Sequence, residues 1–591
     1  MLTGVWLSLF THFLGKKEEI MQQGIGIIKR KNPHGVRVIP GFGLTFGVSV
    51  TMLACLVLIP LASIIWSAGR LSFSEFIQVV TSRQIMSGYQ VSLSCAFMAA
   101  LINVIFGVIL AWILVRYEFP GKRLLDGMIE LPFALPTAVA GIALTTLYSD
   151  QGWIGALFAK AGIKIAYTKA GITIAMIFVG IPFVVRSVQP VLEKLDRGYE
   201  EAAMMLGAGR ARTFFKVILP EIYPAALAGF GLAFARGIGE YGSVVFIAGN
   251  IPFKTQIAPL LIMSKLEQFK YSDATAIAVV LLAISFLLML LINSIQIYMQ
   301  RFRDGGENGA SLKKVVEPYE KDSHRPVKGF LIAVSVLFMV VMMVLPLALV
   351  VSSALKEGWA AYMRAILDEY TVKALKLTVF ATASAVAVNT VFGIFASILI
   401  SKYYFRGRQF LATLIDIPFS ISPVIAGLVF SLTFGNLGWM GGFLQAHNVK
   451  IVFAVPGVIL ATIFVTFPFV FRELLPVLQA QGKEEEEAAA LMGAGKWKIF
   501  SRITFPHIRW ALLYGIVLCT ARAMGEFGAV SVISGHLRGV TNTLPLHVEI
   551  LYNEFNTTAA FAVSSLLVIM AVILLILRSV VVSAGSRKES L

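Results

Sequence analysis

Long apolar stretches, separated by short polar segments, follow one another along the whole chain. A stretch of about 20 mostly apolar residues is long enough to cross the roughly 30 Å hydrocarbon core of a bilayer as a helix. Such stretches lie at 44–66, 91–115, 131–148, 171–188, 222–248, 276–298, 330–352, 377–401, 417–434, 452–471, 508–534 and 559–577. The pattern predicts an all-α, polytopic membrane protein with about twelve transmembrane helices.

The polar segments of the first half recur in the second half at a constant spacing. The segment YEEAAMMLGAGRARTFFKVILP at 199–220 returns as EEEAAALMGAGKWKIFSRITFP at 485–506, and Glu201 and Glu487 occupy matching places 286 residues apart. An ungapped match of this length indicates a duplication. Since each half has an even number of apolar stretches, the two copies are parallel repeats with one orientation, and proteins built in this way usually place their pathway between the halves.

The boundary between the repeats is a segment rich in charge, glycine and proline, which is typical of a flexible linker. The predicted division is an N-terminal extension at 1–40, a first repeat at 41–300, a linker at 301–328, a second repeat at 329–582 and a C-terminal tail at 583–591. The extension has a short apolar run without a leading positive charge or a cleavage site. A translation start at Met21 stays open as an alternative.

Composition and charge support a membrane protein and indicate its orientation. Hydrophobic residues make up 57% of the chain and charged residues 14%, which is far from a soluble composition. The net charge of +17 comes from Lys and Arg gathered in polar segments beside the apolar stretches. Because such segments stay on the inner side, the charge places both repeated polar segments, the linker and both termini in the cytoplasm and does not indicate nucleic-acid binding.

Each repeated polar segment has the signals of a short helix. Both copies begin with acidic residues, continue with alanine and stop at glycine, which suits the helix dipole, helix propensity and a left-handed C-terminal turn respectively. The residues are Glu201, Ala202, Ala203 and Gly207 in the first copy and Glu487, Ala488, Ala489 and Gly493 in the second. A helix of about two turns is unstable alone, so we expect a docking helix that packs on a partner and not a solvated connector.

The pattern E-A-A, three residues, G, nine residues and then hydrophobic-x-[LF]-P resembles the coupling-loop signature of ABC importer permeases. The resemblance implies a bacterial cell-membrane subunit that works with two copies of a separate ATP-binding subunit, which carries ATP and Mg, and with an extracytoplasmic binding protein. In that family the coupling helix sits in a groove of the ATP-binding subunit and transmits its closure.

Flanking sequences narrow the resemblance to bacterial sulfate/thiosulfate importers. The first half, with RYEFPGKRLLDGMIELPFALPTAVAG and GEYGSVVFIAGN, is similar to their first permease subunit. The second half, with FRGRQFLATLIDIPFSISPVIAG and ARAMGEFGAVSVISG, is similar to the second subunit. The likeness covers most of the chain from about 40 to 580 and implies that two subunits are fused into one pseudo-dimer.

Charges inside apolar stretches are candidate pathway residues. Arg236 and Glu240, with their repeats Arg522 and Glu526, are spaced i, i+4 and can neutralise each other. A charge at mid-bilayer costs on the order of 3 kcal/mol or more, so these residues face the protein interior. We expect the arginines to contact an anion and the glutamates to be their structural partners or gate residues, while simple mutual neutralisation is an equal alternative.

Prolines interrupt the third stretch of each half. Pro132 and Pro136, and Pro418 and Pro423, each remove a helical hydrogen bond. Non-helical backbone inside a membrane survives only when it is buried or lines a cavity, so Pro132 and Pro418 are candidates for the pathway. A packing kink is the alternative for any single proline.

The sequence lacks the motifs for ATP hydrolysis and for metal binding. There is no G-x-x-x-x-G-K-[ST], because the GAGKW segment lacks both the leading Gly and the Ser or Thr, so the chain is not expected to hydrolyse ATP. No HExxH or spaced Cys pair indicates a metal site. His447, His536 and His547 are expected to lie solvated in outer loops.

The function predicted by these observations is uptake of sulfate or thiosulfate into the cytoplasm by alternating access. Bringing a dianion into a negative interior costs about 4.6 kcal/mol per 100 mV, so an energy source is required. Permeases for molybdate, tungstate, ferric iron or thiamine stay open as alternatives. An ion-coupled secondary transporter would need more titratable groups in its spans, and a membrane scaffold or sensor would carry a soluble domain.

Overall fold

The computed structural model describes residues 41–304, 325–436 and 438–589, and within them the regular secondary structure is entirely helical. In this part of the chain, ten helical segments are long and apolar enough to cross a membrane, or twelve if two bent helix pairs each count as one span. The twelve apolar stretches read from the sequence are therefore confirmed as helical, with a bend in the third of each half.

The spanning segments follow the same order in both halves, where η marks a π-helical turn. The first half contains α2, η1 and α3 (Phe42–Ala68), α5 (Arg83–Arg116), α10 (Lys169–Lys194), α12, η2 and α13 (Arg210–Ile238) and α16 (Tyr271–Asp304). The second half contains α17 (Arg325–Met339), η3 (Val340–Val344), α18 (Leu345–Ala354), α20 (Glu369–Lys402), α24 and α25 (Val455–Gln481), α27, η4 and α28 (Lys496–Met524) and α31 (Thr557–Glu589).

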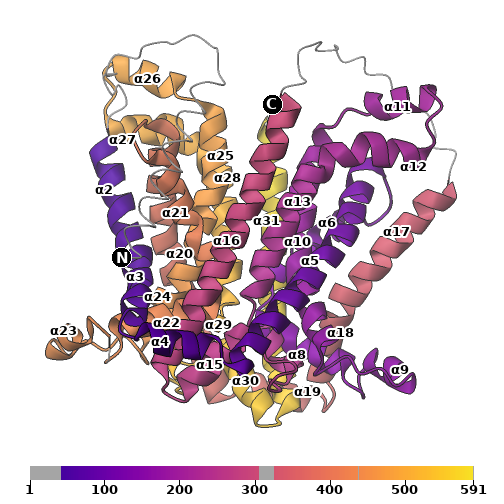
Figure 1. Ribbon diagram of the computed structural model, residues 1–591. Helices are drawn as coiled ribbons and strands as arrows, with labels where there is room; N and C mark the ends of the chain where they lie inside the picture. The colour runs from indigo at the N-terminus through magenta and orange to yellow at the C-terminus, as the bar shows by residue number, and fades with distance from the viewer. Residues whose placement is uncertain (1–40, 305–324, 437, 590–591) are drawn as a thin grey trace.

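Shorter helices lie at the two ends of the bundle. At one end, α11 (Gly198–Met205) and α26 (Glu484–Leu491) lie at the top of Figure 1, on the right and on the left respectively. At the other end lie α4 (Phe73–Val80), α9 (Gly155–Lys160), α15 (Ala258–Glu267), α19 (Trp359–Leu367), α23 (Gly441–Ala446) and α30 (Leu544–Asn553). Both repeated polar segments are thus on one side of the molecule, as parallel repeats require.

The first span of each half packs on the opposite half. Helices α2 and α3 lie along α20 and α22 (Pro423–Phe434), and the Ser63 hydroxyl donates a hydrogen bond to the Val429 carbonyl at 3.1 Å. In the same way α17 and α18 lie against α5 and α8 (Thr137–Tyr148), at the right of Figure 1. The two halves therefore interlock and do not merely touch.

The third span of each half is sharply bent. The segment of α6 (Lys122–Met128) and α7 (Leu131–Ala134) meets α8 at 109°, and α21 (Arg408–Ser420) meets α22 at 105°. The bends lie just before Thr137 and Pro423, a few residues beyond Pro132 and Pro418. Pro132 sits in the first turn of α7, where no backbone donor is needed, and Pro418 is held inside α21. The break itself therefore coincides with Pro136 in the first half and with Pro423 in the second.

The fifth span of each half ends earlier than its apolar pattern indicated. The stretch 222–248 was expected as one helix, but α13 ends at Ile238 and α14 (Val244–Ala248) is separate. A Cβ on Gly239 would lie 3.1 Å from the Ser422 Cα of the other half, so backbones approach closely here. The same break separates α28 from α29 (Gly528–Ser534). Contact between the halves, which apolar periodicity does not report, ends these helices.

The boundaries of the predicted linker and tail are partly helical. Helix α16 continues to Asp304 and α17 begins at Arg325, so helical residues occupy both ends of the expected linker 301–328. Helix α31 continues to Glu589 through the expected tail. The extension 1–40 and the middle of the linker, 305–324, lie outside the described residues.

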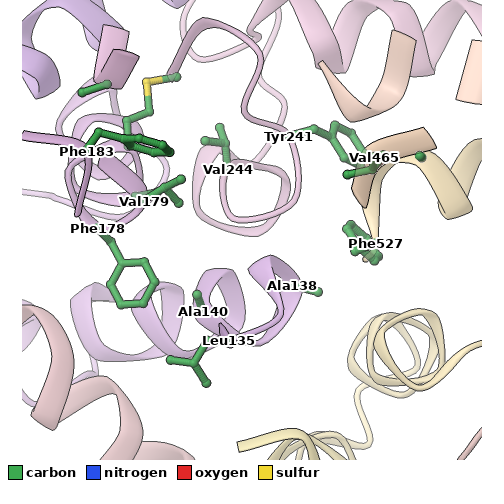
Figure 2. Packing of buried hydrophobic residues seen from close by; sticks show 14 of the residues in the cluster. Leu135, Ala138, Ala140, Phe178, Val179, Phe183, Tyr241, Val244, Val465 and Phe527 are labelled. Atoms are coloured by element: carbon green, nitrogen blue, oxygen red, sulfur yellow. The ribbon is translucent and has the colours of Figure 1, made fainter. Parts of the chain in front are cut away.

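One hydrophobic core runs through both halves. In Figure 2, Val179 and Phe183 of α10 lie near Val244, while Tyr241 from the first half lies beside Val465 and Phe527 from the second half. The rings of Tyr241 and Phe527 stack with their centroids 5.9 Å apart. Burial of these side chains across the interface makes the two repeats one structural unit.

Candidate functional site

A cavity of about 40 Å³ lies between the two halves. Its lining consists of seven positions, each present once in either half and related by the duplication. They are Pro132, Phe133, Leu135, Thr137, Val179, Phe183 and Arg236 from the first half, and Pro418, Phe419, Ile421, Pro423, Val465, Phe469 and Arg522 from the second. The structure thus brings together four of the six predicted pathway residues, namely both arginines and both prolines.

The two arginines are the charged residues of this lining. The Nη2 atom of Arg236 lies 3.3 Å from Glu240 Oε2, and that of Arg522 lies 2.6 Å from Glu526 Oε2. The glutamate side chains are 1% exposed, while the arginine side chains are 14% and 13% exposed. A buried charge needs a partner, and these pairs let two guanidinium groups face one small cavity.

Glu240 and Glu526 do not line the cavity, and each has a second structural contact. Glu240 Oε1 accepts hydrogen bonds from the Ser243 backbone N–H at 3.1 Å and from its hydroxyl at 3.0 Å. Glu526 Oε1 accepts one from the Ala529 N–H at 2.9 Å. Each carboxylate therefore joins an arginine to the start of the following short helix, α14 or α29. This geometry favours the structural-partner interpretation over a gate.

A row of four phenylalanine rings borders the cavity. Ring centroids are 5.2 Å apart for Phe133 and Phe183, 5.8 Å for Phe183 and Phe419, and 6.0 Å for Phe419 and Phe469. On α10, Phe183 follows Val179 by one turn in the direction of α11. The row therefore lies at the edge of the cavity that faces the polar helices.

The repeated polar segments form the expected short helices, α11 and α26. Gly207 and Gly493 have φ angles of 80° and 83°, the left-handed conformation that glycine allows at a helix end. Next to these glycines, Met205 and Leu206 are each 89% exposed, and Leu491 and Met492 are 79% and 89% exposed. Sequence reasoning missed these apolar side chains, although the pair stands at the same place in both copies.

A second duplicated feature ties each polar helix to the membrane helices. Arg116, the last residue of α5, lies 2.7 Å from Glu200, and Lys402, the last residue of α20, lies 2.9 Å from Glu486. Burial raises the pKa of Glu200, although Arg116 acts in the opposite direction. The matching charges at 116 and 402, and at 200 and 486, were the signal in the sequence that could have revealed this anchor.

The basic residue of each anchor also holds the end of the preceding span. Arg116 donates a hydrogen bond to the Leu195 carbonyl at 3.2 Å, and Lys402 donates one to the Gly482 carbonyl at 2.6 Å. Helices α5, α10 and α11 are thus joined at one point, as are α20, α25 and α26. Each polar helix is therefore connected to a span, α10 or α25, that contributes a side chain to the cavity lining.

Lys402→Met is expected to destabilise the protein by about 3–5 kcal/mol, because it leaves the buried Glu486 carboxylate without its cation. The ion-pair side chains are 2% and 3% exposed, so water cannot replace the partner. The measurement is the thermal unfolding midpoint in detergent. Lys122→Met, which breaks an exposed i, i+4 pair with Glu118, is the control and is expected to change stability by less than about 1 kcal/mol. Equal midpoints for the two variants would contradict the argument.

The histidines differ from the expectation in one case. His547 was expected in a solvated loop, but it is buried in α30, with Nε2 3.1 Å from the Thr371 hydroxyl. The packing of α30 on α20 and α31 encloses it. His536 lies 3.1 Å from Glu549 and His447 is exposed. No group of three or more His, Cys, Asp or Glu residues suited to a metal ion occurs among the described residues.

Known proteins resemble this chain in sequence. The sulfate transport system permease protein CysT of Salmonella typhimurium is 49% identical over 260 residues, covering 44% of this chain and 94% of its own length. The sulfate transport system permease protein CysW of Escherichia coli is 48% identical over 252 residues, covering 43% and 87% respectively. A bacterial alginate ABC transporter complexed with a pentasaccharide-bound periplasmic protein matches in structure at 15% identity, with a TM-score of 0.37, over 43% of this chain and 92% of its own.

A comparison with protein families also shows the duplication. The family described as binding-protein-dependent transport system inner membrane component matches the chain twice, at residues 103–304 and 389–587. These two matches include both polar helices, both anchoring glutamates and both cavity arginines. With its spanning helices, the chain is a multi-pass membrane protein and belongs to the family of inner membrane components of binding-protein-dependent transport systems.

Proposed function

We propose that this chain is the complete transmembrane pathway of an ATP-driven importer for sulfate or thiosulfate. The observation that carries the proposal is the cavity between the halves, where Arg236 and Arg522 face the same small space. Guanidinium groups bind tetrahedral oxyanions through paired hydrogen bonds. The sulfate permeases that resemble each half in size and sequence support the same substrate.

Within this pathway the lining residues have distinct roles. Arg236 and Arg522 contact the anion, and Glu240 and Glu526 neutralise and orient them when the cavity is empty of anion. Pro132 and Pro418 line the cavity from the bent segments, close to the bends at Pro136 and Pro423. The row of phenylalanines is the barrier toward the polar-helix side, and alternating access requires that it open after the outer side has closed.

The polar helices connect the pathway to its energy source. Two copies of a separate ATP-binding subunit, which bind ATP and Mg, dock on α11 and α26. The contact residues are Glu201, Ala202, Ala203, Gly207, Glu487, Ala488, Ala489 and Gly493. The exposed apolar pair at the end of each polar helix, its apolar tip, also contributes, namely Met205 and Leu206 in the first half and Leu491 and Met492 in the second. The side that carries these helices is cytoplasmic and holds both termini and the linker, while a sulfate-binding protein docks on the opposite face.

The charge of the cavity also separates the alternative substrates. Two arginines suit molybdate and tungstate as well as sulfate, since all are tetrahedral dianions. Ferric iron and the cationic thiamine would find no carboxylate among the lining residues. The pair of cavity arginines therefore favours an oxyanion, and the permeases that resemble the two halves favour sulfate.

Uptake into vesicles tests the proposal directly. Vesicles contain this chain, its cognate ATPase and its binding protein, and labelled sulfate is supplied with ATP. We expect ATP-dependent uptake that thiosulfate blocks and molybdate barely affects. Absence of sulfate uptake, while another solute still stimulates ATP turnover, would discard the substrate and keep the importer.

A further inference from the structure

A second cluster of arginines lies on the polar-helix side of the phenylalanine row. Helix α10 passes Val179 and Phe183 at the cavity and then reaches Arg186, which is about 5 Å farther along the axis. Arg186 Nη2 lies 2.6 Å from Glu130 Oε1, and Arg186 Nη1 donates to Asp126 Oδ1 at 2.8 Å. Glu130 lies in the bent segment, directly before α7 and two residues before the cavity residue Pro132.

The second half contributes another arginine to the same carboxylate. Arg578 of α31 is in direct contact with both oxygens of Glu130, and its Nη2 donates to the Tyr514 hydroxyl of α28 at 2.9 Å. Two guanidinium groups from opposite halves therefore converge on one carboxylate. The Nε atoms of Arg186 and Arg578 are buried and have no hydrogen-bond partner. The cluster thus has unused donors around the Glu130 carboxylate, while Asp126 contacts Arg186 alone.

In the part of the chain that the structure describes, this arrangement occurs once, although the cavity lining is duplicated. The counterparts of Glu130 and Arg186 are Asp416 and Arg472, which form an ion pair at 2.7 Å. The position that corresponds to Arg578 is Ile292 in the sequence. One side of the pathway therefore has two arginines around a carboxylate, and the other side has one.

We propose that Arg186 and Arg578 form a second oxyanion site, which the Glu130 carboxylate occupies until the transported anion takes its place. The inference rests on the proposed function, since the anion is the one released from the cavity. A tetrahedral dianion can accept from both guanidinium groups, so both arginines stay paired during the exchange. A series of weak sites, each vacated in turn, allows an ion to enter and to leave a pathway.

The exchange would also release a contact between the halves. Glu130 belongs to the bent segment of the first half, while Arg578 lies on the last helix of the second half, which packs on α7. When the anion replaces Glu130, this carboxylate no longer holds α7 to α31. Arrival of the substrate then favours separation of the halves on the polar-helix side.

The test measures labelled sulfate binding to the purified permease and compares two substitutions at the same ion pair. Glu130→Gln removes the competing carboxylate and is expected to tighten binding about tenfold. Arg578→Met removes a guanidinium and is expected to weaken it about tenfold. A purely structural latch would be broken by both substitutions, so changes in the same direction, or no change, would overturn the proposal.

Asp416→Asn is the matched control, because it removes the equivalent carboxylate where only Arg472 is present. It is expected to change sulfate affinity less than Glu130→Gln does, and an equal gain would count against the two-arginine site. The thermal unfolding midpoint, measured with and without sulfate, gives a second readout. Because sulfate binds the folded protein, the midpoint rises only to the extent that each variant binds it. We expect the rise to be larger in Glu130→Gln and smaller in Arg578→Met than in the wild type.

A background lacking the cavity arginines distinguishes this inference from the proposed function. With Arg236, Glu240, Arg522 and Glu526 all replaced by glutamine, so that no buried glutamate loses its cation, residual sulfate binding must come from another site, and Arg578→Met is expected to remove it. Sulfate uptake by the wild type, with no effect of Arg578→Met on residual binding, would overturn the second site alone. No sulfate uptake or binding by the wild type would overturn both.

Discussion

Removing the two cavity arginines together with their glutamate partners is expected to lower ATP-dependent sulfate uptake by about 100-fold or more. The variant carries Arg236→Gln, Glu240→Gln, Arg522→Gln and Glu526→Gln. A hydrogen bond to a charged group contributes about 1.5–3 kcal/mol, so two lost guanidinium contacts are worth about 3–6 kcal/mol to the bound dianion. Replacing both members of each pair avoids leaving a buried glutamate without its cation.

The measurement is the initial rate of sulfate uptake in vesicles, normalised to the amount of inserted permease. The matched control replaces the ion pair of Arg538 and Glu554, which is more exposed, with glutamines and is expected to keep the wild-type rate. Uptake above about one tenth of the wild-type rate in the cavity variant would show that these arginines do not form the anion site.

Replacing the apolar tip of one polar helix with acidic residues is expected to abolish productive association with the ATP-binding subunit. Leu491→Asp and Met492→Asp together change two side chains that are exposed in the isolated chain. Burial of one such side chain is worth about 1.5–3 kcal/mol, so the pair accounts for about 100-fold or more in affinity. Glu486 and Lys402, which anchor the helix, are unchanged, so the fold is expected to persist.

Copurification of the ATP-binding subunit and substrate-stimulated ATP turnover check this prediction. Phe555→Asp is the control, because Phe555 is 90% exposed and follows α30 at the opposite end of the molecule. We expect the control to retain the complex and the tip variant to lose it. A tip variant with full ATP turnover would place the docking surface elsewhere on the chain.

Much of the architecture could be predicted because it depends on local properties of the sequence. The length and spacing of apolar stretches determine that about twelve helices cross the bilayer. A helix is required because a peptide N–H or C=O without a hydrogen bond is energetically costly in hydrocarbon. The bends at the third spans follow from proline, and the ends of α11 and α26 follow from glycine at positive φ. The step of 286 residues determined that the two halves have matching elements.

Other features could not be predicted because they depend on contacts between distant segments. Glu200 and Glu486 anchor the polar helices, although their neighbours Glu201 and Glu487 belong to the more conspicuous motif. Helix α13 ends at Ile238 because the backbone of the other half approaches Gly239. Neither contact leaves a trace in hydrophobic periodicity, which reports burial and not the identity of the partner.

The sequence by itself therefore determined the membrane class, the duplication and the two polar helices, because each of these follows from residue chemistry within one segment. Only the tertiary structure decided that Arg236 and Arg522 face one cavity and that Arg578 joins Glu130 across the halves. The physical reason is that interlocked packing brings together side chains separated by hundreds of residues, and the charge of each site exists only where those side chains meet.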